Sequence, residues 1–175
     1  MMTLAETILM TQIGYENLLA RITEKEKEYD QVRDHRQVAF ELSGDGWHDN
    51  SEFNRMQQLE ANLNHTLKTL NDRLDVMKFI DIHDGKRNVQ QVEIGSIVKL
   101  RRYDLADDSE IEEIWEIRGF DETNIKLKHL AYNAPLAEKI MHLHVADIAE
   151  EVQIGSRHFD IEVVALFKTR LLADI

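Results

Sequence analysis

The sequence contains no cysteine, a single proline and only 7 glycines among its 175 residues. Without cysteine there is no disulfide framework, no thiolate zinc site and no cysteine nucleophile, and the composition suits a reducing compartment. Aromatic residues make up only 7% of the chain against 43% hydrophobic residues, which predicts a modest or divided core. No stretch approaches the length of a transmembrane helix, and Met1–Met10 lack the basic segment of a signal peptide. We therefore expect a cytoplasmic protein without membrane contact.

Positive charge is also scarce, because 21 basic residues face 33 acidic ones and the formal net charge is -12. An excess of this size repels nucleic acids and anionic membranes from the molecule as a whole, although a local basic patch can still contact a phosphate. We therefore expect a protein or a metal ion as the partner.

Residues 1–80 show the repeat of a coiled coil, in which apolar residues recur at alternating spacings of three and four. In the first arm one core position is held by Ile8, Tyr15, Ile22, Tyr29 and Arg36, and the other by Leu4, Thr11, Leu18, Lys25, Val32 and Ala39. In the second arm the series is Phe53, Met56, Leu63, Leu67, Leu70, Leu74 and Met77, with an interruption at Glu60. These spacings predict two long helices that pack along one seam.

The segment Ser43–His48 separates the two arms and contains Gly44 and Gly46, which favour the positive φ angles of a helix end and a tight reversal. Asp49 is the expected N-cap of the second helix, and Glu52 completes a capping-box pattern with it. We therefore expect an antiparallel hairpin whose arms of about 35 residues extend about 50 Å at about 1.5 Å per residue.

Residues 81–175 follow a different pattern, with the period of two that is typical of strands. After the polar linker Asp84–Asn88, alternation appears at 96–102, 111–117 and 125–130, and a hairpin is expected from the strands 151–154 and 158–167 around the turn Gly155–Ser156. The segment 134–143 predicts a short helix with Pro135 in its first turn. The fold class predicted is therefore α+β with two domains: a coiled-coil hairpin at 1–80 and a domain with a mostly antiparallel sheet at 81–175.

Three segments carry a resemblance to a known family. The expected tip Gly44–Phe53, the strand opening Val92–Leu100 and the segment Asn133–Ala137 resemble, in the same order, the corresponding segments of the bacterial GreA/GreB family of transcript cleavage factors. The resemblance covers essentially the whole chain. It implies that the second domain is FKBP-like and that it docks on the β′ rim of the secondary channel of RNA polymerase, while the coiled coil reaches the catalytic centre.

The resemblance assigns chemistry to the acids of the tip. Two-metal phosphoryl chemistry needs a second Mg²⁺, and this hard cation prefers carboxylate and water ligands. Asp45 and Asp49 are the candidate catalytic and metal-binding residues, with Glu52 as a third acid, and the metal would be held only together with RNA polymerase. The chain itself would not be an enzyme, because the polymerase hydrolyses its own backtracked RNA. Asp49 falls on the second essential acid of the family, whereas an ungapped alignment puts Gly46 at the position of the first.

Further candidate contacts come from the same two regions. Trp47 and Glu52 at the tip, and Asn133, Ala134, Pro135 and Leu136 in the second domain, are the predicted partner-binding residues. Each also has a purely structural interpretation. Asp49 and Glu52 suit a helix cap, Trp47 suits packing over the coiled-coil end, and 133–136 suit a helix start.

Two groups of charged or metal-binding side chains remain ambiguous in the sequence. The basic residues Arg33, His35, Arg36 and Arg55 suit either a solvated face or contact with extruded RNA, including its 3′ end. His142 and His144 suggest a metal pair but lack a third ligand.

Three hypotheses follow for the function. The first is a monomeric factor that enters the secondary channel and stimulates cleavage of backtracked RNA through Asp45, Asp49 and Mg²⁺. The second, motivated by Gly46 and Trp47, is a regulator that occupies the channel and inhibits or retunes transcription without cleavage. The third is a coiled-coil adaptor unrelated to transcription.

Overall fold

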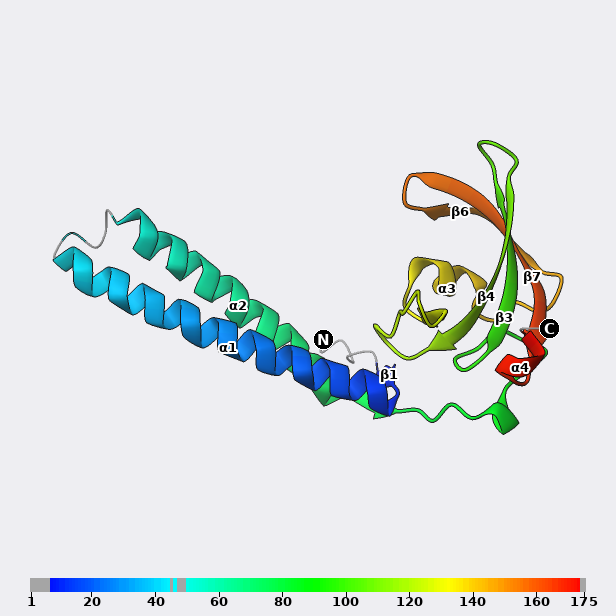
Figure 1. The fold of residues 1–175 in the computed structure, drawn as a ribbon, viewed down its shortest axis with the longest axis horizontal. Coiled ribbons are helices and arrows are strands. Elements are labelled where there is room, and N and C mark those ends of the chain that lie inside the picture. Colours follow the sequence, from blue (N-terminus) through cyan, green and yellow to red (C-terminus); the bar gives the residue numbers. More distant parts are fainter. Residues whose placement is uncertain (1–6, 45, 47–49, 174–175) are drawn as a thin grey trace, which may run out of the picture. The chain divides into compact units, whose positions relative to one another are not determined.

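The structure is a computed structural model, and it describes residues 7–44, 46 and 50–173. Two compact units make up the chain (Figure 1). The first contains Tyr15–Met77, and the second contains Lys78 onward together with the separate segment Leu9–Gly14. The second unit is therefore discontinuous in sequence, and the chain leaves it after Gly14 and returns at Lys78.

The first unit is a hairpin of two long helices, α1 (Gln12–Ser43, 32 residues) and α2 (Ser51–Val76, 26 residues), which lie side by side in Figure 1. The buried and half-buried positions of α1 after its first turn include Tyr15, Leu18, Ile22, Lys25, Tyr29, Val32, Arg36 and Ala39. On α2 they include Phe53, Met56, Glu60, Leu63, Leu67, Leu70 and Leu74. The predicted antiparallel coiled-coil hairpin is confirmed.

The predicted seam is wrong at the base of the hairpin. Ile8 lies in the strand β1 (Ile8–Met10) and Met77 in the strand β2 (Met77–Phe79), and these strands form a two-stranded sheet. Met10 is only 2% exposed, and its carbonyl accepts a hydrogen bond of 2.8 Å from the Ile80 amide. Tertiary pairing has outweighed the local helical pattern here. Leu4 lies outside the described residues.

The predicted start of the second helix is also wrong by one residue. Asn50, not Asp49, is the N-cap of α2: its Oδ1 accepts hydrogen bonds from the amides of Glu52 at 2.9 Å and Phe53 at 3.2 Å. Glu52 is therefore one position too early for a capping box. Its carboxylate instead binds Arg55, with an N–O distance of 3.0 Å. Asp49 lies outside the described residues.

The second unit is built on a five-stranded sheet with the strand order β5-β4-β3-β7-β6. The strands are β3 (Ile97–Asp104), β4 (Glu110–Arg118), β5 (His129–Ala131), β6 (Ile148–Ile154) and β7 (Arg157–Phe167). All neighbours pair antiparallel except β4 and β5, which pair parallel. The expected mostly antiparallel sheet and the hairpin around Gly155–Ser156 are confirmed.

Three helices complete the second unit: η2 (Asp84–Lys86), α3 (Pro135–Ile140) and α4 (Arg170–Ala173). Pro135 occupies the first turn of α3, as predicted. The helix contributes Leu136, Ala137 and Ile140 to the same core cluster as the sheet residues Leu100 and Ile117. Because its inner face is buried, α3 fixes the loop that precedes it.

The alternation at 125–130 does not form the predicted strand. Asn124 and His129 exchange two backbone hydrogen bonds of 2.9 Å, which closes a tight loop, and Lys128 adopts a φ of 55°. Ile125 and Leu127 are 72% and 58% exposed, so these two side chains contribute to no buried face. Only His129–Ala131 joins the sheet.

Among the helices of the described chain, none has the length and apolarity needed to cross a membrane.

Candidate functional site

The end of the hairpin is held by a compact frame of hydrogen bonds between the two helices. The Asn50 Nδ2 group donates to the Ala39 carbonyl at 3.2 Å and to the Ser43 hydroxyl. Ser43 in turn donates to the Ala39 carbonyl at 2.6 Å. The rings of Phe40 and Phe53 pack with their centroids 6.0 Å apart. These contacts join the last turn of α1 to the start of α2.

The connection carries the candidate acids. Gly44 adopts a φ of 53°, in the left-handed region that favours glycine, and provides the start of the chain reversal. Asp45, Trp47 and Asp49 lie outside the described residues, so their assignment to catalysis, metal binding and partner binding stays a prediction. The hydrogen bonds of Asn50 hold the end of α1 and the start of α2 together, so a short connection can join the two helices.

The three arginines near the end of the hairpin have carboxylate partners. Arg55 binds Glu52, and this hydrogen bond lowers the pKa of the Glu52 carboxyl. Arg36 lies 2.9 Å from Glu60, and Arg33 lies 3.6 Å from Asp30. These pairs favour the interpretation of the three arginines as a neutralised helix surface over one as an RNA-binding patch.

The Asn133–Leu136 segment follows β5 and leads into α3. The Asn133 amide clamps the neighbouring loop, because its Nδ2 donates to Asp121 Oδ1 at 3.0 Å and its Oδ1 accepts from the Asp121 amide at 2.9 Å. Ala134 is the N-cap of α3, Pro135 is exposed, and Leu136 is 8% exposed within the core. Pro135 is therefore the exposed residue of this segment, while Asn133 and Leu136 hold the segment in place.

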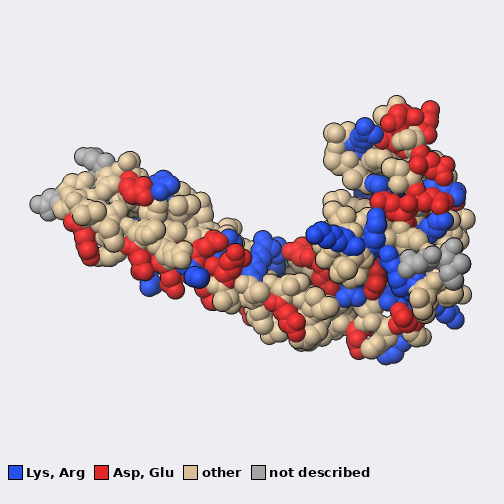
Figure 2. Space-filling model, viewed as in Figure 1, with Lys and Arg blue, Asp and Glu red and all other residues tan. Residues whose placement is uncertain are grey.

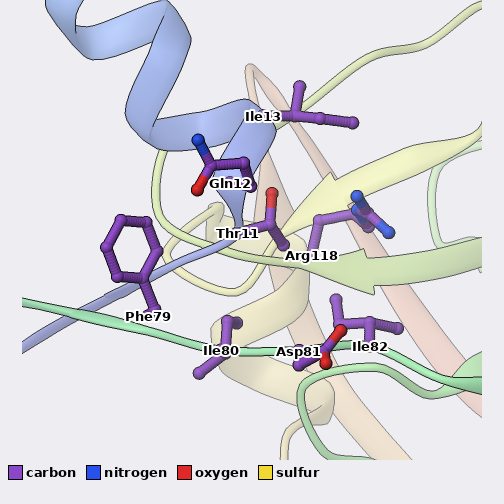
Figure 3. A pocket seen from close by; sticks show the side chains of 8 residues that line it. All are labelled: Thr11, Gln12, Ile13, Phe79, Ile80, Asp81, Ile82 and Arg118. Atoms are coloured by element: carbon purple, nitrogen blue, oxygen red, sulfur yellow. The ribbon is translucent and has the colours of Figure 1, made fainter.

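A pocket of about 470 Å³ in the second unit was not predicted from the sequence (Figure 3). It is lined by Thr11, Gln12, Ile13, Phe79, Ile80, Asp81, Ile82 and Arg118. Thr11 in this lining is held by Glu122, whose side chain is 6% exposed and accepts hydrogen bonds of 2.8 Å from both the amide and the hydroxyl of Thr11. A glycine within a predicted helix was the sequence signal for close packing at this place. The structure gives the reason, because a Cβ at Gly14 would lie 2.2 Å from the Glu122 carboxylate.

Charges on the sheet alternate in sign. Arg101 on β3 lies 2.7 Å from Glu112 and 2.9 Å from Glu110, and on the other side 3.1 Å from Glu162. On the face seen in Figure 2, acidic and basic side chains intermingle.

Among the residues that the structure describes, no group of three or more His, Asp or Glu side chains is arranged to hold a metal ion, so the pair His142 and His144 gains no third ligand.

Comparisons with known proteins give one relative by sequence. The chain is 26% identical over 102 residues to the transcription elongation factor GreA of Maricaulis maris. The match spans 58% of this chain and 61% of that relative, so about two fifths of the relative's length has no counterpart in it. No family model matches the chain.

Comparison of structures gives further similar chains at low scores. Gfh1 of Thermus thermophilus is 18% identical over 92% of this chain and 99% of its own, with a TM-score of 0.42. A GreA/GreB factor of Nitrosomonas europaea is 15% identical over 93% and 98%, with a TM-score of 0.36. The fold assignment rests on the elements and topology described above. The sequence match to GreA confirms the expected resemblance: over 102 residues, this chain is similar to a transcription elongation factor of the GreA/GreB family.

Proposed function

We propose that this protein is a transcription elongation factor that binds RNA polymerase through its secondary channel and stimulates cleavage of backtracked RNA. The observation that carries the proposal is the hairpin of α1 and α2, whose framed end presents a connection with two aspartates. The chain is not the catalyst itself. It supplies groups to the nuclease activity that is intrinsic to the polymerase.

In this mechanism Asp45 and Asp49 are the groups that would hold Mg²⁺ together with carboxylates of the polymerase. The ion, when bound, would stabilise the attacking water and the leaving oxygen of the phosphoryl transfer. The hydrogen bond between Asn50 and Ser43 joins the end of α1 to the start of α2, the two helix ends that flank these acids in the sequence. The helices provide the reach, because 26 residues of α2 correspond to about 39 Å at about 1.5 Å per residue.

Docking would use the second unit and the flanks of the tip. Pro135 is exposed at the start of a helix whose other face is buried, and the Asn133–Asp121 clamp holds it in place. Trp47 and Glu52 are proposed to contact the polymerase inside the channel. The mixed charge of the sheet suits a protein surface better than an RNA strand, and a monomer working in the cytoplasm suffices for this role.

A cleavage assay on stalled elongation complexes tests the role of the acids. Replacing Asp45 and Asp49 by alanine together is expected to reduce transcript shortening by about a hundredfold or more while binding to polymerase persists. Glu41→Ala is the matched control, since Glu41 is an exposed acid in the last turn of α1. Full-rate shortening by the double variant would remove the two aspartates from the mechanism.

The second candidate function is a regulator that occupies the channel without supporting cleavage. The observation that favours it is Gly46, which an ungapped alignment places at the position of the family's first acid. The same assay separates the two candidates. If the protein displaces a known cleavage factor from polymerase but shortens no transcript at any Mg²⁺ concentration, the regulatory function is the correct one.

A further inference from the structure

The seam of the hairpin contains a charged layer that crosses from helix to helix. Glu60 on α2 accepts a hydrogen bond of 3.3 Å from the Tyr29 hydroxyl and lies 2.9 Å from Nε of Arg36, both on α1. The Glu60 side chain is 15% exposed and that of Arg36 is 32% exposed. This layer is the interruption that the heptad pattern showed at Glu60.

A layer of this kind is a poor source of stability. Moving a carboxylate and a guanidinium out of water carries a desolvation cost that the ion pair does not reliably offset, and well-packed apolar residues at such positions are often equal or better. The remaining seam positions of α2 in the described chain are Phe53, Met56, Leu63, Leu67, Leu70 and Leu74. A leucine at position 60 would therefore make that side of the seam continuously apolar.

The geometry of the layer suits a different role. Tyr29 and Arg36 lie seven residues apart on α1, one heptad, and Glu60 is contacted by both. Glu60 is therefore contacted from two directions along the helix axis, by a hydrogen bond from Tyr29 and by an ion pair with Arg36. A shift of α2 along α1 by one heptad would separate it from at least one of these partners. A continuous Phe, Met and Leu seam has no such preference, because apolar layers of similar size can exchange partners.

We propose that Tyr29, Arg36 and Glu60 form a positioning layer that fixes the register of the two arms and thereby the location of the connection Gly44–Asp49. The hydrogen bonds of Asn50 act only at the end of the hairpin, whereas this layer acts within its length. Its consequence for transcription rests on the function proposed above. The register itself can be measured without polymerase.

The absence of cysteine makes a direct measurement straightforward. Nitroxide labels at Thr23→Cys and Thr69→Cys, two exposed positions on opposite arms, report the distance between α1 and α2 by pulsed electron resonance. Glu60→Leu is expected to turn a single narrow distance into a broad or displaced distribution. Dilution with unlabelled protein removes distances between molecules. A distribution identical to that of the parent protein would overturn the proposal.

Matched variants distinguish positioning from loss of stability. Glu26→Leu removes an exposed acid from the same hairpin and is expected to leave the distance unchanged. Glu60→Gln keeps an oxygen acceptor for Tyr29 and is expected to restore the narrow distribution partly. The double variant Glu60→Leu with Arg36→Leu leaves no unpaired charge in this layer and is expected to keep the melting temperature of the parent protein. A melting temperature of the double variant well below that of the parent protein would show that the layer is a stability element and would also overturn the proposal.

The functional part of the proposal uses competition for polymerase. Glu60→Leu is expected to displace a cleavage factor at least about tenfold less effectively than the parent protein, at a temperature where both are folded. If the parent protein itself fails to compete, the function proposed above fails, while the distance measurement still decides the role of the layer. If both proteins compete equally despite a changed distance, the link from register to function is overturned.

Discussion

Glu122 is one of the residues that connect the segment Leu9–Gly14 to the rest of the second unit. Its carboxylate accepts from the Thr11 amide and hydroxyl, and it lies so close to Gly14 and Gly119 that a Cβ at either position would be 2.2 Å away. The Thr11 hydroxyl also accepts a hydrogen bond of 3.3 Å from the Gly14 amide, which is the pattern of an N-cap for α1. One buried carboxylate therefore positions both a strand end and a helix start.

A double-mutant cycle tests this arrangement. Gly14→Ala is expected to lower the free energy of unfolding by about 1–3 kcal/mol, because the methyl group displaces the Glu122 carboxylate from its donors. In a Glu122→Ala background the same change should become stabilising by about 0.5–1 kcal/mol, as for alanine in an ordinary helix. Urea unfolding followed by circular dichroism measures both values. An equal effect of Gly14→Ala in the two backgrounds would contradict the close contact.

His129 gives a prediction for pH. Burial lowers the pKa of His129 below its ordinary value of about 6.5, and the nearby Arg118 lowers it further, although Glu116 opposes the shift. The unfolded chain therefore binds a proton at higher pH than the folded chain does. The contribution of His129 to stability is complete above about pH 6.5 and is lost as the pH falls from there through the lower pKa of the folded state.

The measurement compares the parent protein with His129→Gln. The parent protein should lose stability in urea more steeply between about pH 7 and 5 than the variant does. His65→Gln, at an exposed position on α2, is the control and should keep the steep dependence. Parallel curves for the parent protein and His129→Gln would show that this imidazole does not titrate differently on folding.

At the scale of elements, the long helices and the main strands follow from the period of the sequence, whereas the short elements do not. The heptad spacing predicted α1 and α2, and the alternation predicted most of β3, β4 and β7. The strands β1 and β2 have three residues each, which is too short for any period to be detected. Lys126 and Lys128 alternate with apolar residues but lie in a loop. Alternation of polar and apolar residues therefore also occurs where no strand forms.

The start of α2 shows why an element can be predicted while its boundary is missed. Asp49 and Asn50 are chemically similar caps, and the capping-box spacing to Glu52 favoured Asp49. The choice depends on contacts with α1, since Asn50 also donates to the Ala39 carbonyl and to Ser43. An aspartate has no amide hydrogens with which to make those contacts.

The corresponding prediction concerns the stability of the hairpin end. Asn50→Ala is expected to lower the free energy of unfolding by about 1–2 kcal/mol, because two amides of α2 lose their acceptor. Asn50→Asp should cost less, since it retains the cap but loses the donors to α1. Gln57→Ala, at an exposed position within α2, should change stability by less than about 0.5 kcal/mol. Equal stability of all three variants would remove Asn50 from the frame.

At the scale of the whole molecule, the sequence predicted two units of different architecture and the resemblance that leads to the proposed function. The pocket beside Arg118 and the contribution of Leu9–Gly14 to the second unit were missed, because both depend on segments that are distant in sequence. Glu122 and Thr11, for example, are separated by 111 positions. The assignment of Asp45, Trp47 and Asp49 stays a prediction.

A substitution at Pro135 tests docking by the second unit. Pro135→Glu places a charge on the exposed first turn of α3, where a glutamate is compatible with the helix start. The fold should be retained, and affinity for RNA polymerase should fall by about tenfold or more. Gln153→Glu adds the same charge at an exposed position on β6 and is expected to have little effect. Unchanged binding of Pro135→Glu would direct the search for the docking surface away from α3.

The strap formed by Leu9–Gly14 changes what counts as a domain of this protein. A polypeptide that starts at residue 81 would leave the Phe120 amide without the Leu9 carbonyl and Glu122 without Thr11. The hairpin is better described as an insertion between Gly14 and Lys78 in the sequence of the globular unit. Deleting it by joining Gly14 to Lys78 through a short flexible linker should therefore give a better-folded product than simple truncation.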